Sequence, residues 1–148
     1  MIKDALAQLE PAQGSSDRRH SILIVDDDQT QVEVLTHRLQ HQGFNTVSAY
    51  EGRVGLRKAR EHRPDLVLLD LRLPDLDGFA VCEQLVDSPE TCDIPIIIVS
   101  GSDRQDVVRS SRAAGCEFFV RKPYDPNVLL TLIEQALKRS FDWNTETP

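Results

Sequence analysis

Strand and helix signals alternate five times along this chain of 148 residues. Runs such as LVLL and IIIV are apolar at every position, which is typical of strands that are covered on both faces. Strands that alternate with helices over short connections predict a doubly wound α/β fold with a parallel sheet. We expect its five strands at residues 22–26, 44–49, 65–70, 95–99 and 116–120.

The first and last expected helices are marked by signals at their ends. Thr30-Gln31-Val32-Glu33 fits a capping box, and Gly43 follows the end of the same helix. Asp125 and Pro126 open the last helix, because aspartate caps a helix and proline fits its first position.

The helices between these two have mixed signals. The second, expected near residues 51–62, contains Gly52 and Gly55, and each glycine costs about 1 kcal/mol relative to alanine. The fourth is expected to begin at a cap, Asp103, and to end before Gly115.

We expect one domain over residues 21–139, between an N-terminal extension and linker (residues 1–20) and a C-terminal tail (residues 140–148). The first ten residues carry an apolar set at helical spacing: Ile2, Ala5, Leu6 and Leu9. A helix that short is marginal alone, since isolated helices below about 12 residues rarely persist in water. It is expected either to dock on the domain or a partner, or to fray.

The composition argues against several classes of protein. A net charge of -7 gives no support for direct binding to nucleic acid, which needs a basic face. No apolar run approaches the ~20 residues of a membrane helix, and no signal peptide is visible. Cys82, Cys92 and Cys116 show no CxxC spacing, so we expect free thiols and no structural zinc. These features predict a soluble, cytoplasmic protein.

Polar residues gather where the expected strands end. The stretch Asp26-Asp27-Asp28 lies at the end of the first strand, and Asp70 closes the third. Ser100 closes the fourth strand, and Lys122 follows the fifth. Ligands of doubly wound sheets bind beyond the carboxyl ends of the strands, where the strand order reverses. The sequence therefore places acids, a hydroxyl and an ammonium group at the expected binding edge.

Crowded carboxylates either take up a proton or bind a cation. Mg²⁺ suits this set, because it favours one or two carboxylates together with water and phosphate oxygens, whereas no His/Cys cluster supports zinc. Asp70 is either a further ligand or a nucleophile that attacks phosphorus and forms an acyl phosphate. Lys122 and the hydroxyl of Ser100 can stabilise the added charge. Taken singly, these residues also fit an acidic surface turn, a surface lysine and a capping serine.

Four stretches of the chain, namely ILIVDDD, PDLVLLDLRLPDLDGF, IIIVSG and FFVRKPY, resemble the receiver domain of two-component response regulators. The resemblance covers about residues 21–139. It implies a flavodoxin-like fold with strand order 2-1-3-4-5 and five helices. It also implies a Mg²⁺-dependent aspartyl-phosphate switch in a phosphorelay, with intrinsic self-phosphorylation and dephosphorylation chemistry, and not an enzyme.

The resemblance also implies roles for individual residues. Asp27 is expected to contact Mg²⁺ directly, and Asp26 to support the metal partly through water. Asp70 becomes both a metal ligand and the phosphoacceptor, and the backbone carbonyl of Arg72 a further ligand. These assignments would explain why an apolar strand ends in adjacent acids.

The remaining implied roles concern the phosphoryl group and the switch. Lys122 is expected to pair with the phosphoryl group and to precede Pro123 through a cis peptide bond. Ser100, counted with Asp70 and Lys122 as catalytic, is expected to move toward the phosphoryl oxygen as Phe119 turns inward. Asp28 lies outside the metal pair and is expected to cap or solvate the loop.

The implied partners are a sensor histidine kinase or a histidine phosphotransfer protein, with Asp70 phosphorylated by a phosphohistidine. The output surface is expected on the fourth helix, fifth strand and fifth helix, which is also a candidate homodimer face. Its charged residues are Arg104, Arg109, Arg112, Arg121 and Glu134. No DNA-binding or catalytic output is visible after residue 139, so we expect a stand-alone receiver or part of a longer chain.

Three other readings compete with this one. Asp75-Leu76-Asp77-Gly78-Phe79 superficially resembles the DxDG signature of haloacid-dehalogenase-like phosphatases, but the first Asp does not directly follow an apolar strand. A flavodoxin shares the architecture, yet its first loop must cradle a phosphate, which three carboxylates would repel. A receiver-like scaffold that binds proteins without being phosphorylated remains as the third.

Overall fold

The computed structural model describes residues 19–101, 109–110, 113–116 and 118–146. Its five strands are all parallel and lie in the order β2-β1-β3-β4-β5, which confirms the predicted fold class and strand order. Along the chain the elements are β1 (Ser21–Val25), α2 (Gln29–His41), β2 (Asn45–Ala49), α3 (Gly52–His62), β3 (Leu66–Asp70), α4 (Gly78–Asp87), β4 (Ile96–Ser100), β5 (Phe118–Arg121) and α6 (Pro126–Glu146).

Four of the five helices predicted for the domain lie in the described part of the chain. The helix predicted between Asp103 and Gly115 falls largely outside the described residues, as does the short one predicted at residues 1–10. Helix α6 continues to Glu146, through most of the stretch predicted as a tail. No glycine or proline follows Pro126 before the helix ends, so nothing in the sequence stops it earlier.

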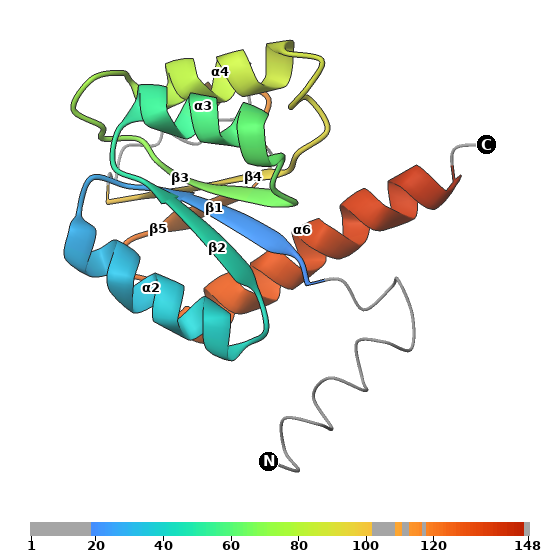
Figure 1. Cartoon of the computed structure of the whole chain (residues 1–148), viewed down its shortest axis with the longest axis horizontal. Helices are drawn as coiled ribbons and strands as arrows, with labels where there is room; N and C mark the ends of the chain where they lie inside the picture. The colour runs from blue at the N-terminus through green and yellow to red at the C-terminus, as the bar shows by residue number, and fades with distance from the viewer. Residues whose placement is uncertain (1–18, 102–108, 111–112, 117, 147–148) are drawn as a thin grey trace.

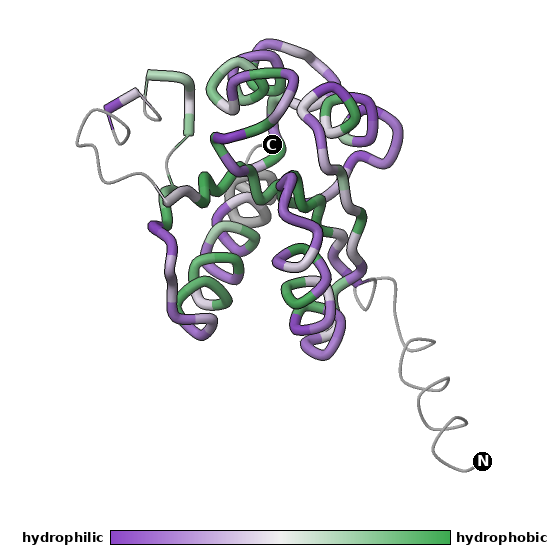
Figure 2. Tube along the Cα trace, turned by 90° about the vertical axis from the view of Figure 1, so that its left-hand side faces the viewer, coloured by the Kyte–Doolittle hydropathy of each residue, from purple (hydrophilic) through white to green (hydrophobic). Residues whose placement is uncertain are grey.

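The helices cover the sheet in two layers (Figure 1). Helices α3 and α4 lie on one face, and α2 and α6 on the other. Within β1, Leu23 and Val25 join the core under α3 and α4, whereas Ile22 and Ile24 join the core under α2 and α6. Figure 2 shows the hydrophobic strands as a green layer between these two pairs of helices. The central strands β1, β3 and β4 are buried on both faces, which explains why their sequences are almost continuously apolar.

The caps of α2 differ in part from the prediction. Asp28 is the N-cap, and its side chain accepts a hydrogen bond of 3.2 Å from the backbone N–H of Gln31. The predicted capping box at Thr30 is wrong, because the helix already begins at Gln29 and Thr30 lies in its first turn. Gly43 follows the helix with φ +94°, as predicted for a residue that ends a helix in the left-handed region.

At Gly55, α3 lies close to the sheet. A Cβ added at Gly55 would lie 2.9 Å from a methyl group of Val25 in β1. The close approach accounts for a glycine in a helix whose interior would otherwise favour alanine.

The expectation of three free thiols is wrong for two of them. Cys82 in α4 and Cys116 just before β5 form a disulfide, and both are buried. The two cysteines are 34 residues apart in the sequence, and the fold brings α4 against the start of β5. Cys92 is a free, exposed cysteine.

Among the described helices, none combines the length and apolar character that a membrane crossing needs.

Candidate functional site

The carboxyl ends of the strands place the predicted site residues along one edge of the sheet. Asp26 and Asp27 directly follow β1, and Asp70 is the last residue of the adjacent strand β3. Ser100 is the last residue of β4, and Lys122 directly follows β5. Because all strands are parallel, these positions meet at the same end of the sheet.

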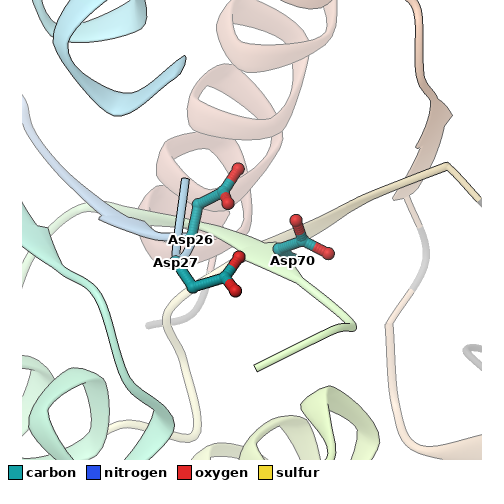
Figure 3. A group of neighbouring side chains, drawn as sticks. All are labelled: Asp26, Asp27 and Asp70. Atoms are coloured by element: carbon teal, nitrogen blue, oxygen red, sulfur yellow. The ribbon is translucent and has the colours of Figure 1, made fainter. Parts of the chain in front are cut away.

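Three carboxylates come together at this edge. One oxygen from each of Asp26, Asp27 and Asp70 lies within 4.8 Å of the other two. Figure 3 shows Asp26 and Asp27 next to each other after β1, with Asp70 at the end of the neighbouring strand. Asp26 and Asp70 are buried and Asp27 is exposed. Carboxylates this close repel one another strongly unless a cation or a proton compensates them.

Lys122 supplies part of that compensation. Its Nζ donates to Oδ2 of Asp26 and to Oδ2 of Asp70, each at 2.9 Å. One ammonium facing three carboxylates leaves two formal negative charges in excess. The group therefore still favours a further cation.

Backbone donors fix the two buried carboxylates. The N–H of Asp28 donates to Oδ1 of Asp26 at 3.0 Å, and the N–H of Arg72 donates to Oδ1 of Asp70 at 2.9 Å. Each acid thus uses one oxygen for the backbone and the other for Lys122. The second bond also keeps the backbone of Arg72 beside the carboxylate of Asp70.

Burial and charge shift the pKa values of the group. Burial raises the pKa of Asp26 above its ordinary value, and the bonds from Asp28 and Lys122 offset this only in part. Burial alone would lower the pKa of Lys122, but its bonds to Asp26 and Asp70 outweigh that effect and raise it. The ammonium form of Lys122 is therefore secured by the same acids that it neutralises.

The donor set fits Mg²⁺. All three side chains offer hard oxygen ligands, and no histidine or cysteine belongs to the group. The excess negative charge at the edge of the sheet also favours a divalent cation. Asp26, Asp27 and Asp70 are therefore the side chains that could hold the ion.

The two predicted switch residues lie on the neighbouring strands. Ser100 is 1% exposed, and its carbonyl accepts a bond of 2.8 Å from the backbone N–H of Lys122. Phe119 lies in β5 opposite Ile98 and packs, partly buried, against the core under α3 and α4. The peptide bond between Lys122 and Pro123 is cis, as predicted.

Sequence reasoning gave no role to Tyr124. This residue lines a small cavity of about 20 Å³ together with Asp26, Asp70 and Lys122. Burial raises the pKa of its hydroxyl above the ordinary value. Its place in the stretch FFVRKPY, two residues after Lys122, was the available signal.

In the sequence, Asp75 stands out only as part of the phosphatase-like stretch, and the structure gives it a different place. Its carboxylate accepts backbone N–H bonds from Gly52 and Arg53 at the start of α3, and the side chain of Asp77 caps α4. The bond from Arg53 has the largest effect and lowers the pKa of Asp75; burial opposes it, and the bond from Gly52 lowers the pKa further. Both acids thus serve as helix caps, and neither belongs to the group of Asp26, Asp27 and Asp70.

The chain matches a known family over most of its length. Residues 22–134 match the family described as the response regulator receiver domain. Among curated relatives, the DNA-binding response regulator MtrA of Mycolicibacterium smegmatis is 40% identical over 126 residues, which are 84% of this chain and 53% of that protein. The chain thus spans about half the length of the MtrA relatives it matches. Protein PilH of Pseudomonas aeruginosa is 37% identical over 116 residues, which are 78% of this chain and 96% of PilH.

Solved structures agree with this match. A CheY-like response regulator receiver domain protein from Methanospirillum hungatei superposes with a TM-score of 0.80 at 27% identity, covering 84% of this chain and 98% of that one. The BeF3-activated DrrB receiver domain superposes with a TM-score of 0.73, also at 27% identity, over 82% of this chain and 99% of that one.

Proposed function

This chain belongs to the response regulator receiver family, and from that premise we propose that it is a Mg²⁺-dependent switch of two-component signalling that is phosphorylated on Asp70. A receiver domain is a signalling module rather than a classical enzyme. The observation that carries the proposal is the group of Asp26, Asp27 and Asp70 within 4.8 Å, with Lys122 bonded to two of the three.

Asp70 is the proposed phosphoacceptor because a backbone hydrogen bond orients its carboxylate and Lys122 lies beside it. A carboxylate oxygen forms the new P–O bond while the P–N bond of a phosphohistidine breaks, and the electron pair of that bond returns to the imidazole nitrogen. The backbone bond from Arg72 holds the carboxylate in place at the end of β3. Such fixed orientation lowers the entropic part of the barrier.

The negative charge of the incoming phosphoryl group needs compensation. We propose that Asp26, Asp27, Asp70 and the backbone carbonyl of Arg72 hold Mg²⁺, which supplies charge neutralisation to the phosphoryl oxygens. Nζ of Lys122 lies 2.9 Å from Oδ2 of Asp70, and Lys122 is proposed to pair with the phosphoryl group. The hydroxyl of Ser100 would donate a further hydrogen bond.

The proposed switch links this chemistry to β5. Ser100 and Lys122 are joined by a backbone hydrogen bond of 2.8 Å, so a shift of Ser100 toward a phosphoryl oxygen acts on the end of β5. Phe119 lies in the same strand and is only partly buried, so an inward turn would bury more of its side chain. Phosphorylation would thereby change the surface beside β5.

Membership of the family implies a histidine kinase as partner, and we propose a sensor histidine kinase or a histidine phosphotransfer protein as the donor. We also expect the reaction to take place in the cytoplasm. The proposed output and homodimer face includes the helix predicted near residues 103–114, most of which lies outside the described residues. That face remains a prediction.

The proposal is tested with a small phosphodonor. Incubation with acetyl phosphate and Mg²⁺ should add one phosphoryl group, seen as a gain of about 80 Da by intact mass spectrometry, and Asp70→Asn should abolish the gain. Asp28→Asn is the matched control, because it removes an acid from the same loop while asparagine remains a good N-cap of α2. No gain with the wild-type protein would overturn the proposal and favour a scaffold that binds proteins without phosphorylation.

A further inference from the structure

Helix α3 is capped by a residue from another part of the chain. The backbone N–H of Gly52 donates to Oδ1 of Asp75 at 2.7 Å, and the N–H of Arg53 donates to Oδ2 at 2.9 Å. Glu51, at the N-cap position of the helix, makes no side-chain capping bond. Asp75 therefore satisfies two of the N–H groups that a helix start leaves without partners.

Asp75 lies at the tip of the loop that follows the proposed phosphoacceptor. The base of this loop is closed by a bond of 3.0 Å from the N–H of Gly78 to the carbonyl of Leu71. Gly78 also lies so close to the chain that an added Cβ would be 2.5 Å from Cα of Leu71. The loop, residues 71–77, is thus fixed at its base by Gly78 and at its tip by Asp75.

Arg72 lies between these two attachments. It forms a bridge with Asp77 across the loop, and its N–H donates to Asp70. Leu76, next to Asp75, packs against the core, and an added Cβ at Gly52 would lie 3.0 Å from its Cβ. The backbone of Arg72 therefore lies in a segment that is held at its base by Gly78 and at its tip by Asp75.

We propose that Asp75 is a positioning residue for the metal site, which seats the loop on the start of α3 and thereby presets the backbone carbonyl of Arg72 for Mg²⁺. The inference rests on the proposed function, because it assumes that this carbonyl is a ligand. Groups that orient metal ligands affect affinity without touching the metal. Asp75 acts here through the loop backbone and not through contact with the ion.

The Mg²⁺ dissociation constant, measured by calorimetry on the full chain, tests the inference. Asp75→Ala should weaken Mg²⁺ binding on the order of tenfold, as is usual for the loss of a group that orients a ligand. Asp75→Asn keeps one acceptor oxygen for the two N–H donors, so its dissociation constant should be intermediate. This partial rescue would not be expected if the residue acted only through its charge.

Two variants serve as matched controls. Arg53→Ala should leave Mg²⁺ binding unchanged, because Arg53 contributes its backbone N–H and its side chain is 78% exposed with Nε 3.9 Å from Asp75. Lys58→Ala removes a different attachment of α3, the bond of 2.6 Å from Nζ to the carbonyl of Ser48. Equal weakening by Lys58→Ala and Asp75→Ala would show a general loosening of the helix and would overturn the inference.

Amide hydrogen exchange provides a second readout. Asp75→Ala should accelerate exchange at Gly52 and Arg53 and, through the loop, at Arg72. If circular dichroism shows that Asp75→Ala does not fold, Asp75→Asn decides alone, and wild-type affinity in that variant overturns the inference. Wild-type affinity in Asp75→Ala, when wild-type protein binds Mg²⁺ and is phosphorylated, overturns the inference and leaves the proposed function intact. Absence of Mg²⁺ binding in the wild type contradicts both.

Discussion

Asp26 and Asp70 hold the ammonium group of Lys122 in the same way. In each acid, Oδ2 accepts from Nζ at 2.9 Å, and Oδ1 accepts a backbone N–H from the residue two positions further along the chain. Two adjacent strands thus end in the same local arrangement, and one lysine joins them. This arrangement orients both buried carboxylates before any ligand arrives, which is the preorganisation that a charged site requires.

Removal of this shared cation should destabilise the metal-free protein. We expect Lys122→Ala to lower the free energy of unfolding by about 2–3 kcal/mol, because two buried carboxylates lose their counter-ion. Mg²⁺ should restore part of the loss, since it binds only the folded state. Urea denaturation with and without Mg²⁺ measures both effects. Lys138→Ala, at an exposed position on α6, is the control, and equal stability of the two variants without Mg²⁺ would contradict the account.

The hydroxyl of Tyr124 should lose its proton at a higher pH than an ordinary tyrosine does. Burial raises the pKa of Tyr124 in the folded state above its ordinary value, so the unfolded state loses this proton first as the pH rises. Its contribution to stability is therefore fully present below about pH 10, the ordinary value, and is lost as the pH rises through the folded-state pKa. Absorbance at 295 nm should show a delayed tyrosinate step that Tyr124→Phe removes. An unchanged titration curve in that variant would show that Tyr124 is not the group with the raised pKa.

The sequence predicted the sheet and its order because these depend on local patterns and general rules. Continuously apolar runs such as Ile22–Val25 and short crossovers specify buried parallel strands, and parallel strands bring their carboxyl ends to one edge. The convergence of Asp26, Asp27 and Asp70 was predictable for that reason. The cis bond before Pro123 came from the family resemblance and not from the pattern.

Contacts between segments distant in sequence were not predictable in the same way. The pairing of Cys82 with Cys116, the capping of α3 by Asp75 and the place of Tyr124 all depend on how separate elements pack. No local spacing encodes such contacts. The capping box at Thr30 was wrong although it is a local pattern. Asp28 and Thr30 can both cap a helix and lie two positions apart, and the structure uses Asp28.

The disulfide determines how many thiols should react before and after reduction. Protein denatured without reductant should show one reactive thiol, that of Cys92, and reduction should raise the count to three. Reduction should also lower the free energy of unfolding by about 2–4 kcal/mol, the usual effect of opening a loop of this kind. Alkylation followed by mass spectrometry, with Cys92→Ser as the control, measures the count. Three reactive thiols before reduction would show that Cys82 and Cys116 are not bonded in solution.

Gly55 should resist replacement by alanine despite its place in a helix. Helix propensity alone would make Gly55→Ala stabilising by up to about 1 kcal/mol. The added Cβ would lie 2.9 Å from Val25, however, and overpacking in a close-packed interior typically costs about 1–3 kcal/mol. We therefore expect a net loss of stability in thermal or urea unfolding. Gly101→Ala, where an added Cβ meets nothing within 4 Å, should be close to neutral, and a more stable Gly55→Ala would contradict the packing of α3 on β1.

The central claim is that Asp70 is the residue that accepts phosphorus, and mapping of the acyl phosphate tests it most directly. After incubation with acetyl phosphate and Mg²⁺, borohydride reduces an aspartyl phosphate to homoserine, which tandem mass spectrometry locates in the sequence. We predict homoserine at position 70 and at no other aspartate, with none formed when Mg²⁺ is chelated. Homoserine at Asp26, Asp27 or another position, or its absence from a protein that is otherwise folded, would contradict the account.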